Sequence, residues 1–555
     1  MRRWSSRARN GTYAIANNSS NGTGAGAGTL NIGGAISGGA AGATVLSLGG
    51  SNTNSNPISG TIGNGSATSL ALTKGDAGTW TLTKAPAYTG VTTISGGSLD
   101  IVGPIGNVTM PSSSIINNAT MRFALTGGGI GILTLANAIS GTGAFTIDTD
   151  SSNGSRVQLQ GTAMSNARTW NIVNKGALWL VGGAGTWGSI MNVNVDLGTG
   201  ARLSVSGSSA GAIFNIGSLT GNGQVIAENA PAGETLVVGN GDGSSTYSGV
   251  MSGVCALTKA GSGTLTLNGP NTYTGATTVH AGTLALGSAG SLSNSPTLVV
   301  GDAGSGGAVL DVTAKTGFTI ASNQALKGIG TVNVGPGKVV TNNGTLATGN
   351  SIGTLNITGG YKFGATSVWL LETDATTSDQ IAISEGVTIA SGAQIAFSGG
   401  TGAASYVLAT YSGPLVGSFA STTPPAGYSL DYSIAGQIRL LLTNGGYTAW
   451  AATNAGGQAA NLDYDHDGVS NGVEYFMGKT GSSFTANPSV AGGKVTWPRD
   501  PAALATFKVQ VSTDLAIWTD VLPPNPSIDE SIPTQVTYTL PIGVPKQFCR
   551  LAVMP

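Results

Sequence analysis

Two segments of this 555-residue chain repeat each other at a constant offset. Residues 71–101 and 256–286 align without a gap, and about half of their positions are identical. Both carry Leu-Thr-Lys, then Gly-Thr-x-Thr-Leu, then Tyr-Thr-Gly-x-Thr-Thr, and finally Gly-x-Leu. A unit this short cannot bury its own apolar face and has to stack on neighbouring units. The repeat therefore predicts a solenoid.

The second copy shows what one unit contains. Residues 263–267 alternate threonine with apolar residues at period two, which predicts a strand with one buried face. Residues 268–271 read Asn-Gly-Pro-Asn, a turn signal, and two further short strands are expected at 277–279 and 283–286. Short strands separated by glycine turns predict coils of roughly 20–25 residues.

These patterns predict an all-β protein whose main part is a right-handed parallel β-helix over residues 10–443. Repeats are placed at 71–103, at 256–287 and, in degenerate form, at 139–182. A β-propeller is the alternative, but it needs even units of about 40–50 residues, and the copies are unevenly spaced. Residues 1–9 are expected to be an unstructured start.

The composition excludes several classes of protein. Charged residues make up 8%, the net charge is −1, and glycine supplies 90 residues. So few lysines and arginines give no electrostatic footprint for nucleic acid or for an anionic membrane surface. Asn, Ser, Thr and Gly interrupt every apolar cluster, so no transmembrane helix is expected.

The N-terminus and the cysteines say little about the compartment. Basic residues open the chain, but no apolar stretch follows them, so we expect an incomplete start with the export signal lost upstream. Cys255 and Cys549 are far apart in the sequence. Two buried thiols are the default expectation, with one long-range disulfide as the alternative.

The repeating sequence pattern ends at residue 443. Residues 444–480 are predicted to form a helix, a calcium loop and a second helix. The loop spans residues 463–474 and fits the pattern D-x-D-x-D-G-x5-E. At its positions 1, 3, 5, 7, 9 and 12 it would offer Ca²⁺ hard oxygen ligands. These candidate ligands are Asp463, Asp465, Asp467, the Val469 carbonyl, Asn471 and Glu474.

Short helices are expected on both sides of this loop, at 447–452 and at 471–477. Asn471 is also expected to form a capping box with Glu474. The loop is single, so it resembles the structural calcium loops of extracellular proteins, such as thrombospondin type 3 or dockerin repeats. A weak affinity of about 10⁻⁴–10⁻³ M is expected, as in extracellular modules.

Residues 486–555 are predicted to form a small β-sandwich. Five alternating segments are expected to be strands, separated by proline-rich turns: 494–497, 506–512, 517–519, 535–540 and 547–553. The calcium loop is then expected to stiffen the joint between the β-helix and this sandwich.

The stretch LTKAGSGTLTLNGPNTYTGATTVHAGTLALG at 256–287 resembles the autotransporter-associated β-strand repeat of bacterial surface proteins. Residues 71–103 resemble it nearly as well. The resemblance implies a β-solenoid that is secreted or displayed on the outer cell surface. Many members of that family have no assigned biochemistry, so the resemblance implies a scaffold rather than a particular reaction.

The sequence gives little indication of a catalytic site. The sequence has two histidines and no arrangement that indicates a nucleophilic triad. A polysaccharide-degrading β-helix would need clustered carboxylates. The candidates for such a cluster are Asp148 and Asp150, with Glu372, Asp374 and Asp379 further along the chain.

Aromatic residues suggest a binding function instead. Trp170, Trp179 and Trp187 recur at spacings of nine and eight residues, and they could stack sugars if exposed or fill the core if buried. The sequence thus favours a non-catalytic, stalk-like or adhesin-like rod whose cofactor is Ca²⁺. The alternative is a polysaccharide-binding or polysaccharide-degrading β-helix. Surface glycans or cell-surface proteins are the expected partners, and the oligomeric state is left open.

Overall fold

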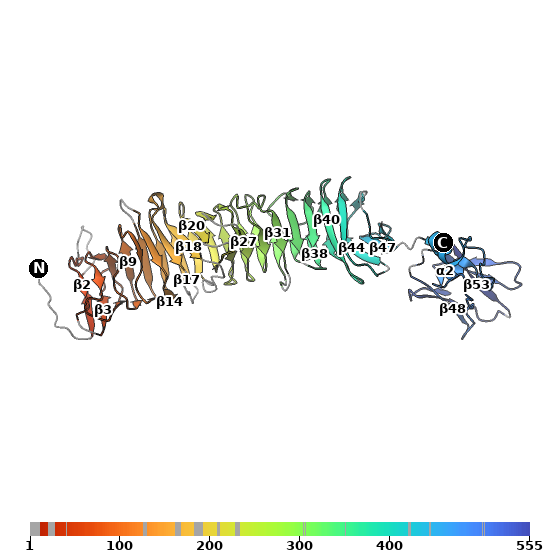
Figure 1. The fold of residues 1–555 in the computed structure, drawn as a ribbon, viewed down its shortest axis with the longest axis horizontal. Coiled ribbons are helices and arrows are strands. Elements are labelled where there is room, and N and C mark those ends of the chain that lie inside the picture. The colour runs from red at the N-terminus through yellow and green to blue at the C-terminus, as the bar shows by residue number, and fades with distance from the viewer. Residues whose placement is uncertain are drawn as a thin grey trace. The chain divides into compact units, whose positions relative to one another are not determined.

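The computed structural model is almost entirely β (Figure 1). Among the residues that it describes, two short α-helices lie near the C-terminus. It describes residues 11–19, 28–39, 42–125, 130–160, 168–182, 193–207, 211–227, 233–302, 305, 307–349, 351–403, 405–419, 423–442, 446–501, 503, 505–544 and 546–554. The chain divides into two compact units. The first comprises Met1–Trp369, Ile381–Gln394 and Ser412–Ala420, and the second comprises Leu370–Gln380, Ile395–Tyr411 and Ser421–Pro555.

The first unit is a stack of coils joined by parallel strands, which confirms the expected parallel β-helix. One sheet runs along the stack, and each of its strands pairs in parallel with the strand one coil later. Its strands are β4 (Ser55–Ile58), β7 (Thr79–Leu82), β9 (Ser98–Val102), β12 (Thr120–Ala124), β15 (Ala144–Ile147), β17 (Arg168–Ile172), β19 (Val193–Leu197), β22 (Ser218–Gly221), β25 (Ser245–Tyr247), β28 (Thr264–Leu267), β30 (Thr283–Leu286), β32 (Val309–Asp311), β35 (Thr331–Asn333) and β38 (Thr354–Thr358). Their first residues lie 19 to 27 positions apart, close to the coil length that the repeat predicts.

Further parallel sheets form the other sides of the coils. One contains β1 (Thr12–Ala16), β3 (Ala43–Gly49), β6 (Ser69–Lys74), β8 (Thr92–Ile94), β11 (Ser114–Asn117) and β14 (Ala138–Ser140). Another contains β10 (Asn107–Thr109), β13 (Ile132–Leu135), β16 (Arg156–Gln160), β18 (Ala177–Gly182), β20 (Arg202–Gly207), β23 (Gln224–Ala227) and β26 (Met251–Gly253). The short strands β2 (Ile36–Ser37) and β5 (Ile62–Gly63) pair with each other, and a 3₁₀ turn spans Ser151–Asn153.

The later coils use two more parallel sheets. The first includes β21 (Ile213–Ile216), β24 (Thr235–Val238), β27 (Ala256–Lys259), β29 (Thr277–Val279), β31 (Thr297–Val300), β34 (Ala325–Gly328) and β37 (Thr345–Thr348). The second contains β33 (Phe318–Ile320), β36 (Val339–Asn342), β39 (Gly360–Phe363), β42 (Val387–Ile389) and β45 (Leu415–Val416). The strands β28, β29 and β30 lie where the repeat predicts them.

The core of this unit follows from the period-two alternation. In the long sheet, Trp80, Leu99, Met121, Phe145 and Trp170 occupy successive register positions and are all fully buried. The Phe145 and Trp170 rings stack with centroids 4.3 Å apart and planes 8° from parallel. Parallel register therefore lines up apolar side chains into columns inside the coils.

Some turns between coils are so tight that only glycine fits. A Cβ built at Gly249 would lie 1.8 Å from the carbonyl oxygen of Gly223. A Cβ at Gly269 would lie 1.7 Å from the carbonyl oxygen of Gly249. These glycines form a column in which backbone touches backbone from one coil to the next.

The second unit contains strands that pair antiparallel rather than parallel. Here β44 (Ser405–Tyr411) and β46 (Tyr428–Asp431) both pair antiparallel with β47 (Gln437–Leu442). The expectation of a parallel β-helix as far as residue 443 is therefore wrong for these strands. A short turn joins β46 directly to β47, and such hairpins impose antiparallel pairing. The strands β40 (Val368–Thr373), β41 (Gln380–Ile383) and β43 (Gln394–Gly399) precede them in the chain.

The rest of this unit contains two helices and two antiparallel sheets. The helices are α1 (Gly446–Asn454) and α2 (Asn471–Phe476), close to their predicted places. One sheet has the order β48 (Lys494–Pro498), β52 (Gln535–Thr539), β51 (Ile528–Asp529), and the other β50 (Thr519–Val521), β49 (Thr506–Ser512), β53 (Phe548–Met554). The sequence patterns predict all of these strands approximately except β51.

A single apolar cluster joins α2 to both sheets. From α2 it includes Val473 and Phe476, and from the sheets it includes Trp497, Val509 and Val536. All five are at least nine-tenths buried. The helix that ends the acidic loop is thus part of the core of the C-terminal sheets.

Candidate functional site

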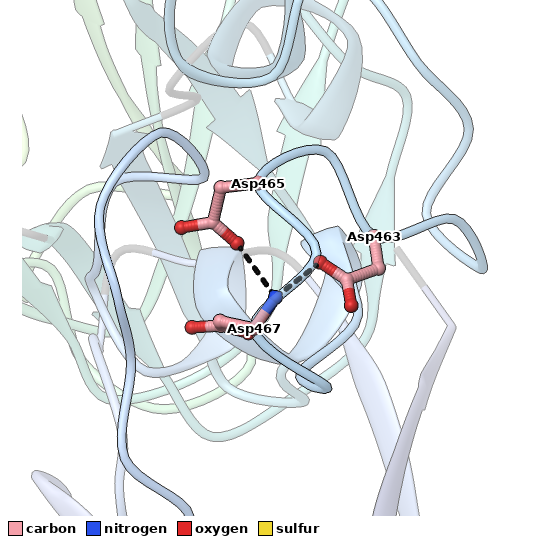
Figure 2. A group of neighbouring side chains, drawn as sticks. All are labelled: Asp463, Asp465 and Asp467. Carbon is pink, nitrogen blue, oxygen red and sulfur yellow. Dashed lines mark hydrogen bonds between the residues drawn. The ribbon is translucent and has the colours of Figure 1, made fainter.

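Three aspartates come together in the loop before α2. One carboxylate oxygen from each of Asp463, Asp465 and Asp467 lies within 4.8 Å of the other two (Figure 2). Three negative charges at this separation repel one another unless a cation or protons lie between them. The predicted spacing therefore brings its first three candidate ligands together.

Backbone N–H groups fold the loop around these carboxylates. The amides of His466 and Gly468 donate to the two oxygens of Asp463, each at 2.8 Å, and the Val469 amide donates to Asp467 Oδ1 at 2.7 Å. Gly468 has a φ of 90°, which a residue with a side chain rarely adopts. This is the sharp turn that the pattern predicts at position 6.

Glu474, at position 12, is fully buried, and its carboxylate has no hydrogen-bond partner on either oxygen among the described residues. Burial raises its pKa to about 7, a nearby Thr485 hydroxyl offsets part of this rise, and the charges of Asp465, Asp467 and Asp463 add to it. An unpartnered buried carboxylate is costly. A cation held between it and the aspartates would supply the missing partner.

Two further candidate ligands are placed differently. Val469 is buried with its side chain in the apolar cluster, so its carbonyl is the group it could offer. Asn471 is also buried; its Oδ1 accepts from the Tyr464 amide at 3.1 Å and its Nδ2 donates to Ala459 at 3.3 Å. The expected capping box is wrong, because the N-cap of α2 is Ser470. The side-chain amide of Asn471 instead hydrogen-bonds the backbone of the loop.

Of the three tryptophans of the degenerate repeat, Trp170 and Trp179 are described by the structure, and neither is exposed. Trp170 is fully buried against Phe145, so it fills the core and offers no face to a ligand. Trp179, on β18, is half-buried, and the Arg156 guanidinium lies 4.1 Å from the centre of its ring. Trp187 lies outside the described residues.

The carboxylates considered for polysaccharide cleavage serve the local backbone and neighbouring side chains. Asp148 bonds Arg122 at 2.6 Å and Asn174 at 2.8 Å. Asp150 caps the 3₁₀ turn and accepts from Ser152. Asp374 accepts from the amides of Thr376 and Thr377, and Asp379 accepts from the amide of Glu372. Asp148, Asp150, Asp374 and Asp379 thus each have a structural partner, and Glu372 is exposed.

Residues that the two repeats share take part in the same polar network twice. The Tyr88 hydroxyl bonds the Thr92 hydroxyl, which bonds Ser112, which donates to the carbonyl of Gly90. In the second repeat Tyr273, Thr277, Ser295 and Gly275 make the same chain of bonds. The tyrosines, threonines and serines are all buried. The motif Tyr-Thr-Gly-x-Thr-Thr thus supplies the tyrosine, the threonine and the glycine carbonyl of a buried network, and a serine further along the chain completes it.

The lysine of each Leu-Thr-Lys is the residue that sequence patterns alone assign to no role. Lys74 and Lys259 are buried, and each ammonium donates to three backbone carbonyls. For Lys259 these belong to Ala260, Gly261 and Ala281. A lysine that recurs at the same position of both repeats, in a chain with so few charged residues, was the sequence signal that could have indicated this structural role.

One buried carboxyl should make the stability of the solenoid depend on pH. Glu234 is fully buried, and burial raises its pKa although the Gly207 amide donates to it. The folded state then retains a proton that the unfolded chain loses above its ordinary pKa of about 4.3, so stability should fall as pH rises through this window. We expect Glu234→Gln to weaken this fall in thermal melts between pH 4 and 7. The exposed Glu372→Gln should melt like the wild type at each pH.

The fold and the repeats together define a parallel β-solenoid. Residues 72–101 and 257–286 match the family described as Passenger-associated-transport-repeat. The chain is also similar to the "Adhesin BmaC autotransporter" of Brucella suis biovar 1 (strain 1330), with 32% identity over 239 residues. That alignment covers 38% of this chain and 7% of the relative, so the chain spans a small part of that protein's length.

No helix in the described part of the chain is long and apolar enough to cross a bilayer. Both cysteines are free; Cys255 is buried and Cys549 is half-buried.

Proposed function

We propose that the protein is a non-catalytic, adhesin-like scaffold, secreted or displayed on the outer cell surface, whose C-terminal unit is ordered by Ca²⁺. The stack of parallel coils carries the first part of this proposal, because it presents a long repeated surface. The two matched repeats and the similarity to an autotransporter adhesin support an extracellular location. Surface glycans or cell-surface proteins are the partners that this location offers.

The calcium part of the proposal rests on Glu474. Its buried, unpartnered carboxylate lies in the exit helix of a loop whose three aspartates share one small volume. The donors are all oxygens, which suits a hard cation such as Ca²⁺. Bound calcium would hold α2 and the loop in place, and α2 in turn packs into the core of the C-terminal sheets.

Calcium should therefore stabilise residues 446–555 as a whole, including both antiparallel sheets. At 10 mM Ca²⁺ and an affinity of about 10⁻⁴–10⁻³ M, the gain in unfolding free energy is about 1.4–2.7 kcal/mol. Hydrogen exchange of residues 446–555, with calcium and with a chelator, measures it. Peptides from residues 55–360 should exchange alike in both conditions.

Two variants test whether the loop is responsible for this gain. Asp465→Asn should remove most of the calcium response, and Asp529→Asn, in the exposed β51, should retain it. If Asp465→Asn responds to calcium as the wild type does, the site is elsewhere and this part of the proposal fails.

Adhesion can be tested with the purified chain on beads. Beads that carry the chain should adhere to epithelial cells more than albumin-coated beads, and soluble chain should compete. Release of new reducing ends from a polysaccharide panel would contradict the non-catalytic proposal. No adherence above albumin, in the presence of calcium, would contradict the adhesin-like one.

A further inference from the structure

We propose that a pocket between two turns of the solenoid binds one carboxylate-bearing sugar, such as a uronic or sialic acid residue of a surface glycan. The proposal gives a ligand class to the adhesin-like function above and rests on it. The pocket has a volume of about 210 Å³. That is below the roughly 300–1,000 Å³ of sites for drug-sized ligands, so it suits a single sugar ring.

Two turns and a strand form the walls. The turn between β30 and β31 contributes Leu292 with the Ser291 and Ser293 hydroxyls. The turn between β32 and β33 contributes Lys315, and the half-buried ring of Phe318 opens β33. Each side of the pocket thus combines an apolar or aromatic side chain with a polar one.

Hydrogen bonds between the residues around the pocket hold it in shape without a ligand. Gln324 is buried, and its Nε2 donates to the carbonyls of Leu292 at 2.9 Å and Ser295 at 2.7 Å. Lys315 Nζ donates to the carbonyl of Ser288 at 2.7 Å, which links the two turns. A preformed pocket spends little binding energy on ordering its own residues.

The charged residue in the lining of the pocket is Lys315. Lys315 uses one of its three N–H groups on Ser288 and forms no ion pair with any described residue. Lys338 donates to the carbonyl of Thr313 in the same turn and likewise forms no ion pair. Asp311, which ends β32 just before this turn, accepts from the Thr313 amide at 2.9 Å and does not line the pocket. The ammonium of Lys315 is therefore the charge in the lining, and it favours an anionic ligand.

The groups present match a sugar acid. A carboxylate would accept a charge-assisted hydrogen bond from Lys315. The apolar face of a pyranose ring could lie against Phe318, as sugars do on aromatic rings. The hydroxyls of Ser291 and Ser293 hydrogen-bond each other at 3.0 Å, and a hydroxyl can donate one bond and accept two, so each retains capacity for a ring hydroxyl.

Saturation-transfer NMR on the full chain tests the proposal, with D-glucuronate and N-acetylneuraminate as probes and D-glucose as the neutral comparison. We expect binding of at least one acidic probe and weaker or no binding of glucose. Lys315→Gln retains a donor for Ser288 but removes the charge, and should weaken binding by about tenfold or more. Phe318→Ala should weaken it through loss of stacking.

The matched control is Lys362→Gln, at an exposed lysine on β39 of the same unit. It should bind as the wild type does. Thermal melts identify a variant that fails to fold, and Phe318→Leu then replaces Phe318→Ala, because it fills the wall but cannot stack.

Three results would overturn the proposal: no binding of either acidic probe, equal binding of glucose, or unchanged binding by Lys315→Gln. The bead assay separates this failure from failure of the proposed function. If beads adhere to cells equally with and without Lys315→Gln, and neither acidic probe binds, the adhesin-like function stands and the sugar-acid pocket does not.

Discussion

Replacing Lys259 by methionine should destabilise the solenoid by about 2–4 kcal/mol. Methionine has a similar length but no donor, so the carbonyls of Ala260, Gly261 and Ala281 would be left without their hydrogen bonds. Burial lowers the pKa of Lys259 to about 8, so at neutral pH the side chain is still mostly an ammonium with three N–H groups. Chemical denaturation at pH 7, followed by circular dichroism, measures the loss.

The same substitution at other lysines shows whether the loss of stability comes from the buried hydrogen bonds. Lys74→Met should cost a similar amount, because Lys74 makes the equivalent bonds. Lys362→Met, at an exposed site, should change stability by less than about 0.5 kcal/mol. Equal stability of Lys259→Met and wild type would show that the three bonds contribute nothing.

Trp170→Ala should destabilise the solenoid by about 3–5 kcal/mol. The substitution removes a fully buried indole and its stacking on Phe145, and leaves a cavity inside the coil. Denaturant midpoints at constant slope measure the change. The same experiment tests the core assignment of Trp170 against the binding role considered from the sequence.

Two controls accompany this variant. The indole Nε1 of Trp170 has no hydrogen-bond partner among the described residues, so Trp170→Phe should cost less than about 1.5 kcal/mol. Trp179→Ala should cost less than Trp170→Ala because Trp179 is only half-buried. A small loss for Trp170→Ala would place this ring outside the packed core.

The sequence was most informative where a local pattern repeats. Period-two alternation at 263–267 and the glycine turns at 268–271 and 282 place β28, β29 and β30 closely. Spacing alone also identified Asp463, Asp465 and Asp467 as a cluster, because an EF-hand-like loop is a local structure. Both predictions concern residues that are close together in the chain.

The burial of individual side chains and the direction of strand pairing were harder to predict. The row of tryptophans could be exposed or buried, and only the register of β15 and β17 places Trp170 under Phe145. The buried roles of Lys259 and Thr277 depend on carbonyls and hydroxyls of the next coil, some 18 to 22 residues away. The antiparallel strands β44, β46 and β47 share the alternating pattern of the parallel ones, and alternation does not encode strand direction.

The column of glycines at the coil corners restricts how such a chain can diverge. Gly249 and Gly269 each leave no room for a Cβ against the carbonyl of the coil below. A mutation at either position would push two coils apart, whereas an outward threonine such as Thr266 can change without moving the backbone. Selection should therefore keep the corners fixed and let the outer faces drift. Repeats in this chain would then lose recognisable similarity on the surface long before they lose the ability to stack.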